Sequence, residues 1–255
     1  MTPPSVGLVP VRCLNCTEHH SSGIDFTMAF QPIIDCKRKQ IFGYEALVRG
    51  CNNESAFSVL SKVTDKQRYH FDQHCRVKAI SLASQLGLSG VLSINFLPNA
   101  IYRPERCIQT TLEAARRYQF PVENIMFEFT ENEQATDSKQ LMSIIECYTK
   151  LNLRTAIDDF GAGYSGLNLL ADFQTDLVKL DMALIRHIHK DRNRQIIVKH
   201  TVDMLRALNI EILAEGVETK EEYDFLKTLD IDYVQGYYFA HPGFESLPEV
   251  DLSLI

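Results

Sequence analysis

Short apolar segments alternate with longer amphipathic segments along the chain from Phe26 onward. Segments of four to seven residues rich in β-branched and aromatic side chains predict strands. These segments are Met28 to Ile34, Phe42 to Val48, Val91 to Phe96, Ile125 to Thr130, Arg154 to Ile157, Leu177 to Leu180, Glu211 to Ala214 and Tyr233 to Phe239. The predicted helices between them are Lys66 to Leu86, Pro104 to Tyr118, Ser138 to Leu151, Asn193 to Leu208 and Lys220 to Leu229. This alternation predicts repeated βα units.

About eight strands in roughly 250 residues, with no linker between them, predict an α/β fold of the (β/α)8 TIM-like barrel type. An open doubly wound sheet is the alternative. The connection from Asp35 to Ile41 is too short for a helical crossover and suits a hairpin, so the first strand is expected to be antiparallel to the second. Residues 1–25 are predicted to form a leader, and residues 26–255 the barrel domain.

Composition and charge narrow the possible environments of the chain. No apolar run approaches the ~20 residues that a membrane helix needs, and residues 1–10 lack a signal-peptide pattern. We therefore expect a cytoplasmic protein that does not bind a membrane. The net charge of -7, without a basic stripe, argues against duplex nucleic acid as a partner. A small anionic ligand remains compatible with this charge if metal ions meet it locally.

The 7 cysteines are scattered along the chain, which favours reduced thiols over a disulfide framework. Cys13 and Cys16 have C-x-x-C spacing and precede His19 and His20, so this segment could hold zinc or act as a redox pair. The alternative is a leader with incidental thiols, because no second C-x-x-C completes a site.

Two adjacent carboxylates, Asp158 and Asp159, end a short apolar run and precede a turn that contains Gly161 and Gly163. Neighbouring anions repel one another, so a cation or a set of donors must offset the repulsion. Adjacent strand residues point to opposite faces, and the two side chains can share an ion only if the backbone bends, as these glycines permit. The alternative is an Asp-Gly-rich turn that caps the next helix.

Polar residues also lie within or just after the other predicted strands. They are Glu45, Asn95, Glu128, Glu131, Lys179, Asp181, Glu215, Glu218 and Gln235. Any one of them could be a cap or a satisfied buried group, but a barrel brings all of these strand ends into one ring at its catalytic face. Hard oxygen ligands suit Mg²⁺ or Mn²⁺, and Lys179 and Arg49 add cations, which together indicate phosphoryl transfer.

Several short motifs occur in an order that is highly specific. They are Gln31-Pro32-Ile33, Glu45-Ala46-Leu47-Val48-Arg49, Ser93-Ile94-Asn95, Glu128-Phe129-Thr130-Glu131, Asp158 to Ser165, Lys179-Leu180-Asp181, Ala214 to Glu218 and Gln235-Gly236-Tyr237-Tyr238. This set resembles the EAL-domain family, the cyclic di-GMP phosphodiesterases of bacteria, over about residues 30–242. The resemblance implies hydrolysis of cyclic di-GMP to linear pGpG with two Mg²⁺ or Mn²⁺ ions, and a homodimer. Ca²⁺ is expected to occupy the same site and inhibit, because the larger ion makes its bound water less acidic.

The resemblance also implies three sets of site residues. The metal ligands would be Glu45, Asn95, Glu128, Asp158 and Asp159. The catalytic set would be Lys179 and Glu215, which position or deprotonate the attacking water, and Glu131, which anchors the loop that begins at Asp159. The substrate-binding set would be Gln31, Arg49, Asp181, Glu218, Gln235 and Gly236.

Two other functions compete with this interpretation. An EAL domain without catalysis would act as a cyclic di-GMP receptor or as a protein-interaction module. Such relatives usually lack a metal ligand or the lysine, whereas every expected position is filled here. An enolase-like barrel with a lysine base and Mg²⁺ is a second rival, but neither the aspartate pair nor the Gln235 motif singles it out.

Overall fold

The structure is a computed structural model, and it describes residues 24–98, 101, 103–130, 138–163 and 166–255. Its strands are β1 Thr27–Asp35, β2 Gln40–Arg49, β3 Val91–Asn95, β4 Ile125–Thr130, β5 Arg154–Phe160, β6 Leu177–Leu180, β7 Glu211–Ala214, β8 Tyr233–Val234 and β9 Gly243–Phe244. Its α-helices are α2 Ala56–Leu60, α3 Arg68–Gln85, α4 Pro104–Cys107, α5 Gln109–Arg117, α6 Ser138–Lys150, α7 Gly166–Asp172, α8 Met182–Ile185, α9 Arg192–Ala207 and α10 Lys220–Thr228. Short 3₁₀ helices are η2 Val122–Asn124 and η3 Leu252–Leu254.

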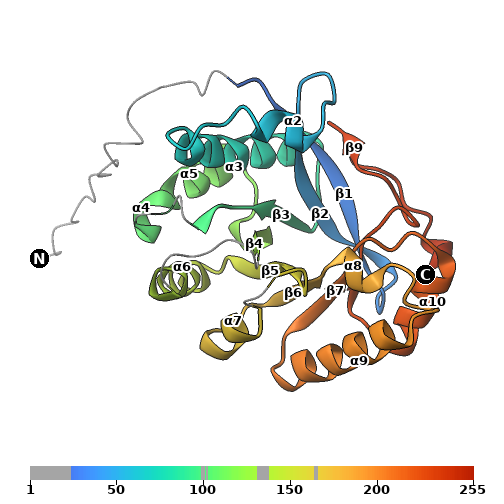
Figure 1. The fold of residues 1–255 in the computed structure, drawn as a ribbon. Coiled ribbons are helices and arrows are strands. Elements are labelled where there is room, and N and C mark those ends of the chain that lie inside the picture. The colour runs from blue at the N-terminus through green and yellow to red at the C-terminus, as the bar shows by residue number, and fades with distance from the viewer. Residues whose placement is uncertain (1–23, 99–100, 102, 131–137, 164–165) are drawn as a thin grey trace, which may run out of the picture.

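The strands close into a barrel (Figure 1). From β2 to β8 each strand runs parallel to the next along the chain. Strand β1 closes the ring, because it is antiparallel to β2 along its length and antiparallel to β8 at Ile34 and Asp35. The predicted barrel and its antiparallel first strand are therefore confirmed, and the alternative of an open sheet is wrong.

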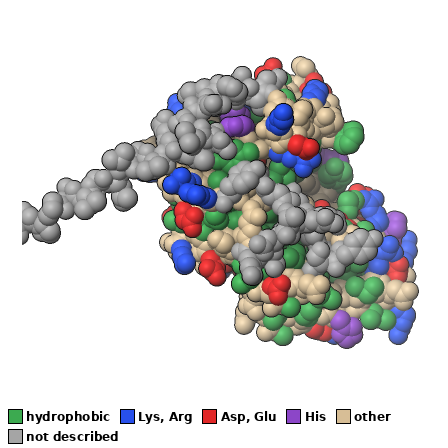
Figure 2. Space-filling view, turned by 60° about the vertical axis from the view of Figure 1, so that its left-hand side comes forward, with side chains coloured by type: hydrophobic (Ala, Val, Ile, Leu, Met, Phe, Trp, Pro, Cys, Tyr) green, Lys and Arg blue, Asp and Glu red, His purple; other side chains and the backbone are tan. Residues whose placement is uncertain are grey.

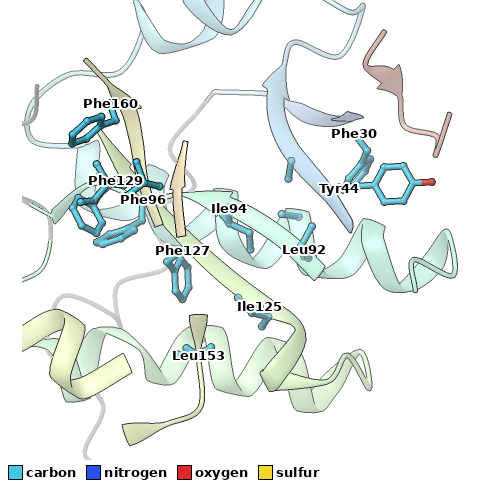
Figure 3. Packing of buried hydrophobic residues seen from close by; sticks show 14 of the residues in the cluster. Phe30, Tyr44, Leu92, Ile94, Phe96, Ile125, Phe127, Phe129, Leu153 and Phe160 are labelled. Atoms are coloured by element: carbon cyan, nitrogen blue, oxygen red, sulfur yellow. The ribbon is translucent and has the colours of Figure 1, made fainter. Parts of the chain in front are cut away.

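Helices cover the outside of the barrel, and the longer ones are α3, α5, α6, α9 and α10 (Figure 1). On the face shown in Figure 2, charged side chains of both signs lie among hydrophobic ones. A layer of apolar side chains lies between these helices and the strands, and Phe96, Phe127 and Phe129 belong to it (Figure 3). Among the described helices, none combines the length and the apolar character needed to span a bilayer.

The eighth strand is shorter than the sequence predicted. It ends at Val234 rather than at Phe239, because the chain turns at Gly236 and Tyr238 N donates to Val217 O at 3.0 Å. A Cβ on Gly236 would lie 2.0 Å from Val217 O, so this close approach requires glycine. The predicted helix from Pro104 to Tyr118 is also interrupted, at Ile108, between α4 and α5.

A second, smaller apolar cluster fills the inside of the barrel. Its members are Ile33, Val91, Met126, Ala156, Leu177, Leu213 and Tyr233, with Phe42 packed against them. The ring of Tyr233 lies 4.1 Å from that of Phe42 between centroids, and its hydroxyl donates to Glu211 Oε1 at 3.0 Å. The barrel interior is therefore a packed core, and this apolar layer is the floor beneath the polar residues described next.

Candidate active site

Polar residues occupy the positions two residues beyond this apolar layer. Ser93, Glu128, Asp158, Lys179, Glu215 and Gln235 follow Val91, Met126, Ala156, Leu177, Leu213 and Tyr233 in that order. Side chains two apart on a strand point to the same face, so these residues form the next inward layer, toward the C-terminal ends of the parallel strands. Glu45 joins this layer beside Ser93, its partner across β2 and β3. Strand alternation thus places the predicted residues from six strands in one ring.

Lys179 is the centre of this polar layer. Its Nζ lies 2.7 Å from Glu215 Oε1, 2.9 Å from Glu128 Oε2 and 2.9 Å from Asp158 Oδ1. Glu45 Oε2 lies 3.4 Å from the same atom, and the lysine side chain is fully buried. Burial alone would lower the pKa of Lys179, but the surrounding carboxylates, Asp158 first, raise it well above its usual value. Lys179 is therefore held as an ammonium ion.

The carboxylates around this one ammonium outnumber it, and the pKa values of Glu128 and Glu215 are raised, mainly by burial. Burial raises the pKa of Glu128 to about 8, and the neighbouring Glu45 and Asp158 add to the rise, while Lys179 opposes it. Burial also raises the pKa of Glu215 well above its usual value, again against the effect of Lys179. Ser93 Oγ donates a hydrogen bond to Glu128 Oε1. The site is thus short of positive charge, which a bound divalent cation would supply.

The acidic side chains fall into two overlapping groups. Oxygen atoms of Glu45, Glu128 and Asp158 lie within 4.8 Å of one another, and so do those of Asp158, Asp159 and Glu215. Asp158 belongs to both groups. Asn95 Nδ2 donates to Glu45 Oε1 at 3.0 Å, which places an amide beside the first group. Carboxylate and amide oxygens are the ligands that Mg²⁺ and Mn²⁺ prefer, so this donor set fits two such ions.

The backbone bend that the aspartate pair needs is present at the end of β5. Asp159 itself takes a left-handed conformation, with φ of 55°, and the pairing of β5 with β6 slips between Ile157 and Phe160. Gly161 follows with φ of 98°. The bend thus begins on Asp159, earlier than the glycines that the sequence indicated. Burial, together with the charge of Asp158, raises the pKa of Asp159 to about 6.

A cavity of about 210 Å³ opens beside this layer. Its lining residues are Gln31, Glu45, Asp159, Asp181, Met182, Glu215, Gly216, Glu218, Gln235, Gly236 and Tyr237. Five of the six predicted substrate-binding residues line it, and it adjoins both acidic groups. The sequence analysis did not assign Met182, Gly216 and Tyr237, although each directly follows an assigned residue on the chain.

Hydrogen bonds fix several of the lining side chains. Gln235 Nε2 donates to Glu45 Oε2 at 2.9 Å, which joins the cavity wall to the first acidic group. Asp181 caps α8, where its Oδ1 accepts from Ala183 N at 2.8 Å. Glu218 Oε1 accepts from Arg186 at 2.5 Å. These contacts hold the polar groups in place before any ligand arrives, which lowers the entropy cost of binding.

Arg49 is the predicted substrate-binding residue that does not line this cavity. It ends β2, and its Nη1 donates to Val48 O at 2.8 Å. Glu131 and the segment with Cys13, Cys16, His19 and His20 lie outside the described residues. Ser93 is a site residue that the sequence analysis did not assign, and its position two residues after Val91 is the signal that identifies it.

Comparisons with known proteins agree with this geometry. The family model described as "EAL domain" matches residues 18–242. A standalone EAL protein of Vibrio cholerae O395, solved in a c-di-GMP-bound form, is 64% identical, with 91% of this chain and 98% of that chain covered and a TM-score of 0.88. BlrP1 of Klebsiella pneumoniae, solved as a manganese and cyclic di-GMP complex, is 33% identical, with 91% and 59% covered and a TM-score of 0.84.

Two curated relatives come from Escherichia coli (strain K12). The blue light- and temperature-regulated antirepressor BluF is 30% identical over 231 residues, which are 90% of this chain and 57% of BluF. The probable cyclic di-GMP phosphodiesterase PdeG is 30% identical over 226 residues, which are 84% of this chain and 44% of PdeG. The chain thus spans about half the length of these relatives. The family match, with the strand-end ring of acidic residues around Lys179, shows that the chain belongs to the EAL-domain family.

Proposed function

We propose that this protein is a phosphodiesterase that hydrolyses cyclic di-GMP to linear pGpG with Mg²⁺ or Mn²⁺. The observation that carries the proposal is the pair of acidic groups that share Asp158, surround Lys179 and adjoin the cavity. Relatives named as phosphodiesterases and structures solved with cyclic di-GMP support the choice of substrate.

Two sets of this chain's residues would hold the metals. Glu45, Asn95, Glu128 and Asp158 would bind one ion, and Asp159 would help to bind the second. Bound Mg²⁺ or Mn²⁺ supplies Lewis acidity toward the phosphodiester and lowers the pKa of water. We further propose that Ca²⁺ occupies the oxygen-lined site without supporting turnover, because it is larger and less polarising.

Within this mechanism, Lys179 and Glu215 have different roles. The raised pKa of Lys179 keeps the ammonium protonated, so it orients the water and neutralises charge on the phosphate. Glu215 accepts a hydrogen bond from Lys179 at 2.7 Å, and burial raises its pKa above the usual range of a carboxyl, so it is the stronger base that takes the water proton. Water oxygen bonds to phosphorus, the bond to the 3′ oxygen breaks, and that oxygen leaves with a proton as a 3′ hydroxyl.

Binding of the nucleotide falls to the other cavity residues. Asp181 and Glu218 present carboxylates, which accept hydrogen bonds of the kind that the N–H edge of guanine donates. Gln31, Gln235 and Gly236 would complete the contacts. Arg49 remains a predicted phosphate ligand and Glu131 a predicted anchor of the loop after Asp159. The homodimer, the cytoplasmic location and the barrel domain over 26–255 likewise remain predictions.

The test is an activity assay on purified protein with cyclic di-GMP, followed by separation of the nucleotides. We expect pGpG with Mg²⁺ or Mn²⁺ and none with EDTA. Glu45→Ala removes one oxygen ligand and should abolish turnover while the protein stays folded. Glu221→Ala, a matched control, removes an exposed carboxylate from α10 and should keep full turnover. Wild-type turnover by Glu45→Ala at saturating Mg²⁺ would refute the ligand assignment.

A second candidate function is a non-hydrolysing receptor of cyclic di-GMP or a protein-interaction module. The alignment with BluF covers 90% of this chain, and the name of BluF, an antirepressor, favours the protein-interaction module. Lys179 and all the predicted metal ligands favour catalysis instead, because a receptor does not need them. Binding of cyclic di-GMP by wild-type protein that never forms pGpG would decide for the receptor.

A further inference from the structure

A buried ion pair lies on α3, behind the wall of the barrel. Arg76 donates to Asp72 one helical turn away, and the exposed fractions of these residues are 0% and 3%. The site described above uses neither residue. Both lie on the side of α3 that packs against the strands, among Phe71, Cys75 and Ala79.

The guanidinium of Arg76 contacts the aromatic side chains that flank two predicted metal ligands. Its Cζ lies 5.2 Å from the ring centroid of Phe127 and 5.8 Å from that of Phe96. These two rings meet edge to face, with centroids 5.5 Å apart, and Figure 3 shows them on the outer side of the strands. Phe127 directly precedes Glu128, and Phe96 directly follows Asn95.

Asp72 contacts the backbone of the same region. Its Oδ1 accepts from Leu97 N at 3.0 Å, and Phe96 N donates to Glu128 O at 2.9 Å. The segment that follows Asn95 is therefore held on one side by α3 and on the other by β4. These two hydrogen bonds connect the ion pair to the ends of β3 and β4, where two predicted ligands lie.

Stability alone does not account for this pair. Replacing a buried ion pair with apolar residues of similar volume is often neutral or stabilising. The buried, uncharged hydroxyl of Tyr148 also interacts with the Arg76 guanidinium. The pair instead makes contacts with a fixed direction. Arg76 places a charge over the rings of Phe96 and Phe127, and Asp72 accepts a hydrogen bond from Leu97 N.

We propose that Asp72 and Arg76 are positioning residues for the candidate metal site, which fix Asn95 and Glu128 through Leu97, Phe96 and Phe127. This inference rests on the proposed function. It extends the site from the barrel interior through the strands to the surrounding helices. Groups that hydrogen-bond directly to metal ligands typically change metal affinity by about 10- to 100-fold when they are removed, and we expect the lower end of this range for a pair that acts through the neighbours of two ligands.

The test is calorimetric titration of MnCl₂ into metal-free protein, with no substrate present. In the double variant Asp72→Leu/Arg76→Met, apolar groups of similar volume replace the pair. We expect it to unfold at or above the wild-type temperature, yet to bind Mn²⁺ at least tenfold more weakly. If the pair only stabilised the fold, the unfolding temperature and the Mn²⁺ affinity would change together. Asp72→Asn, which keeps Oδ1 for Leu97 but removes the charge, should weaken Mn²⁺ binding at least threefold.

Arg154→Met is the matched control, because Arg154 pairs with Glu211 at the opposite end of the barrel. It should leave the dissociation constant for Mn²⁺ unchanged. Wild-type Mn²⁺ affinity in the double variant and in Asp72→Asn would overturn the positioning role. A different failure, in which Glu45→Ala binds Mn²⁺ as well as the wild type, would overturn the metal site itself and the inference with it.

Discussion

The stability of the metal-free protein should depend on pH through Glu128. Burial raises the pKa of this carboxyl from 4.5 to about 8, so the folded state binds the proton more tightly than the unfolded chain. Its stabilising contribution is therefore complete below pH 4.5 and is lost as the pH rises to about 8. One proton corresponds to about 1.4 kcal/mol per pH unit, so the loss between pH 5 and 8 is on the order of 4 kcal/mol.

Urea unfolding in EDTA at pH 5, 6, 7 and 8 measures this loss. Glu128→Gln removes the titrating group, and its free energy of unfolding should fall less steeply with pH than that of the wild type. Glu215 and Asp159 also have raised pKa values, so the free energy of unfolding of Glu128→Gln should still fall with pH. Glu221→Gln, which removes an exposed carboxylate, should keep the wild-type slope. Equal slopes for Glu128→Gln and wild type would refute the assignment of the proton to Glu128.

Three further predictions concern metals and turnover. Affinity for Mn²⁺ should rise between pH 6 and pH 8, because the proton on Glu128 must leave before a metal binds; titration at each pH checks this. Ca²⁺ should compete with Mg²⁺ and inhibit hydrolysis, and turnover with Ca²⁺ as fast as with Mg²⁺ would contradict the proposed role of the ions. Lys179→Ala and Glu215→Gln should lower kcat by about 10² or more and still bind cyclic di-GMP, whereas Gln235→Ala should raise KM first; steady-state rates and ligand titration separate these effects.

The polar ring was predictable because two regularities combine in the sequence. Strand alternation places every second residue on the inner face, and the barrel brings the ends of its parallel strands together. Lys179, Glu215 and Gln235 were placed in the ring from their positions at the strand ends, and only their roles came from the resemblance. The spacing of two residues from the apolar layer would also have identified Ser93.

Other features depend on packing that the local pattern does not encode. The register slip at Asp159 becomes visible only when β6 lies beside β5. The spacing of Asp72 and Arg76 on α3 is typical of a surface ion pair, and only the contacts with Phe96 and Phe127 show that it is buried. Helices α2, α7 and α8 have five, seven and four residues, too few for a helical period to stand out.

The most direct test of the central claim is hydrolysis in ¹⁸O-labelled water. Purified wild-type protein is incubated with cyclic di-GMP and Mn²⁺, the nucleotides are separated, and their masses are measured by mass spectrometry. We predict linear pGpG that carries one ¹⁸O atom in its 5′ phosphate, because water attacks phosphorus while Lys179 and Glu215 hold it. Cyclic di-GMP that is bound by the protein but recovered intact and unlabelled would contradict the phosphodiesterase assignment.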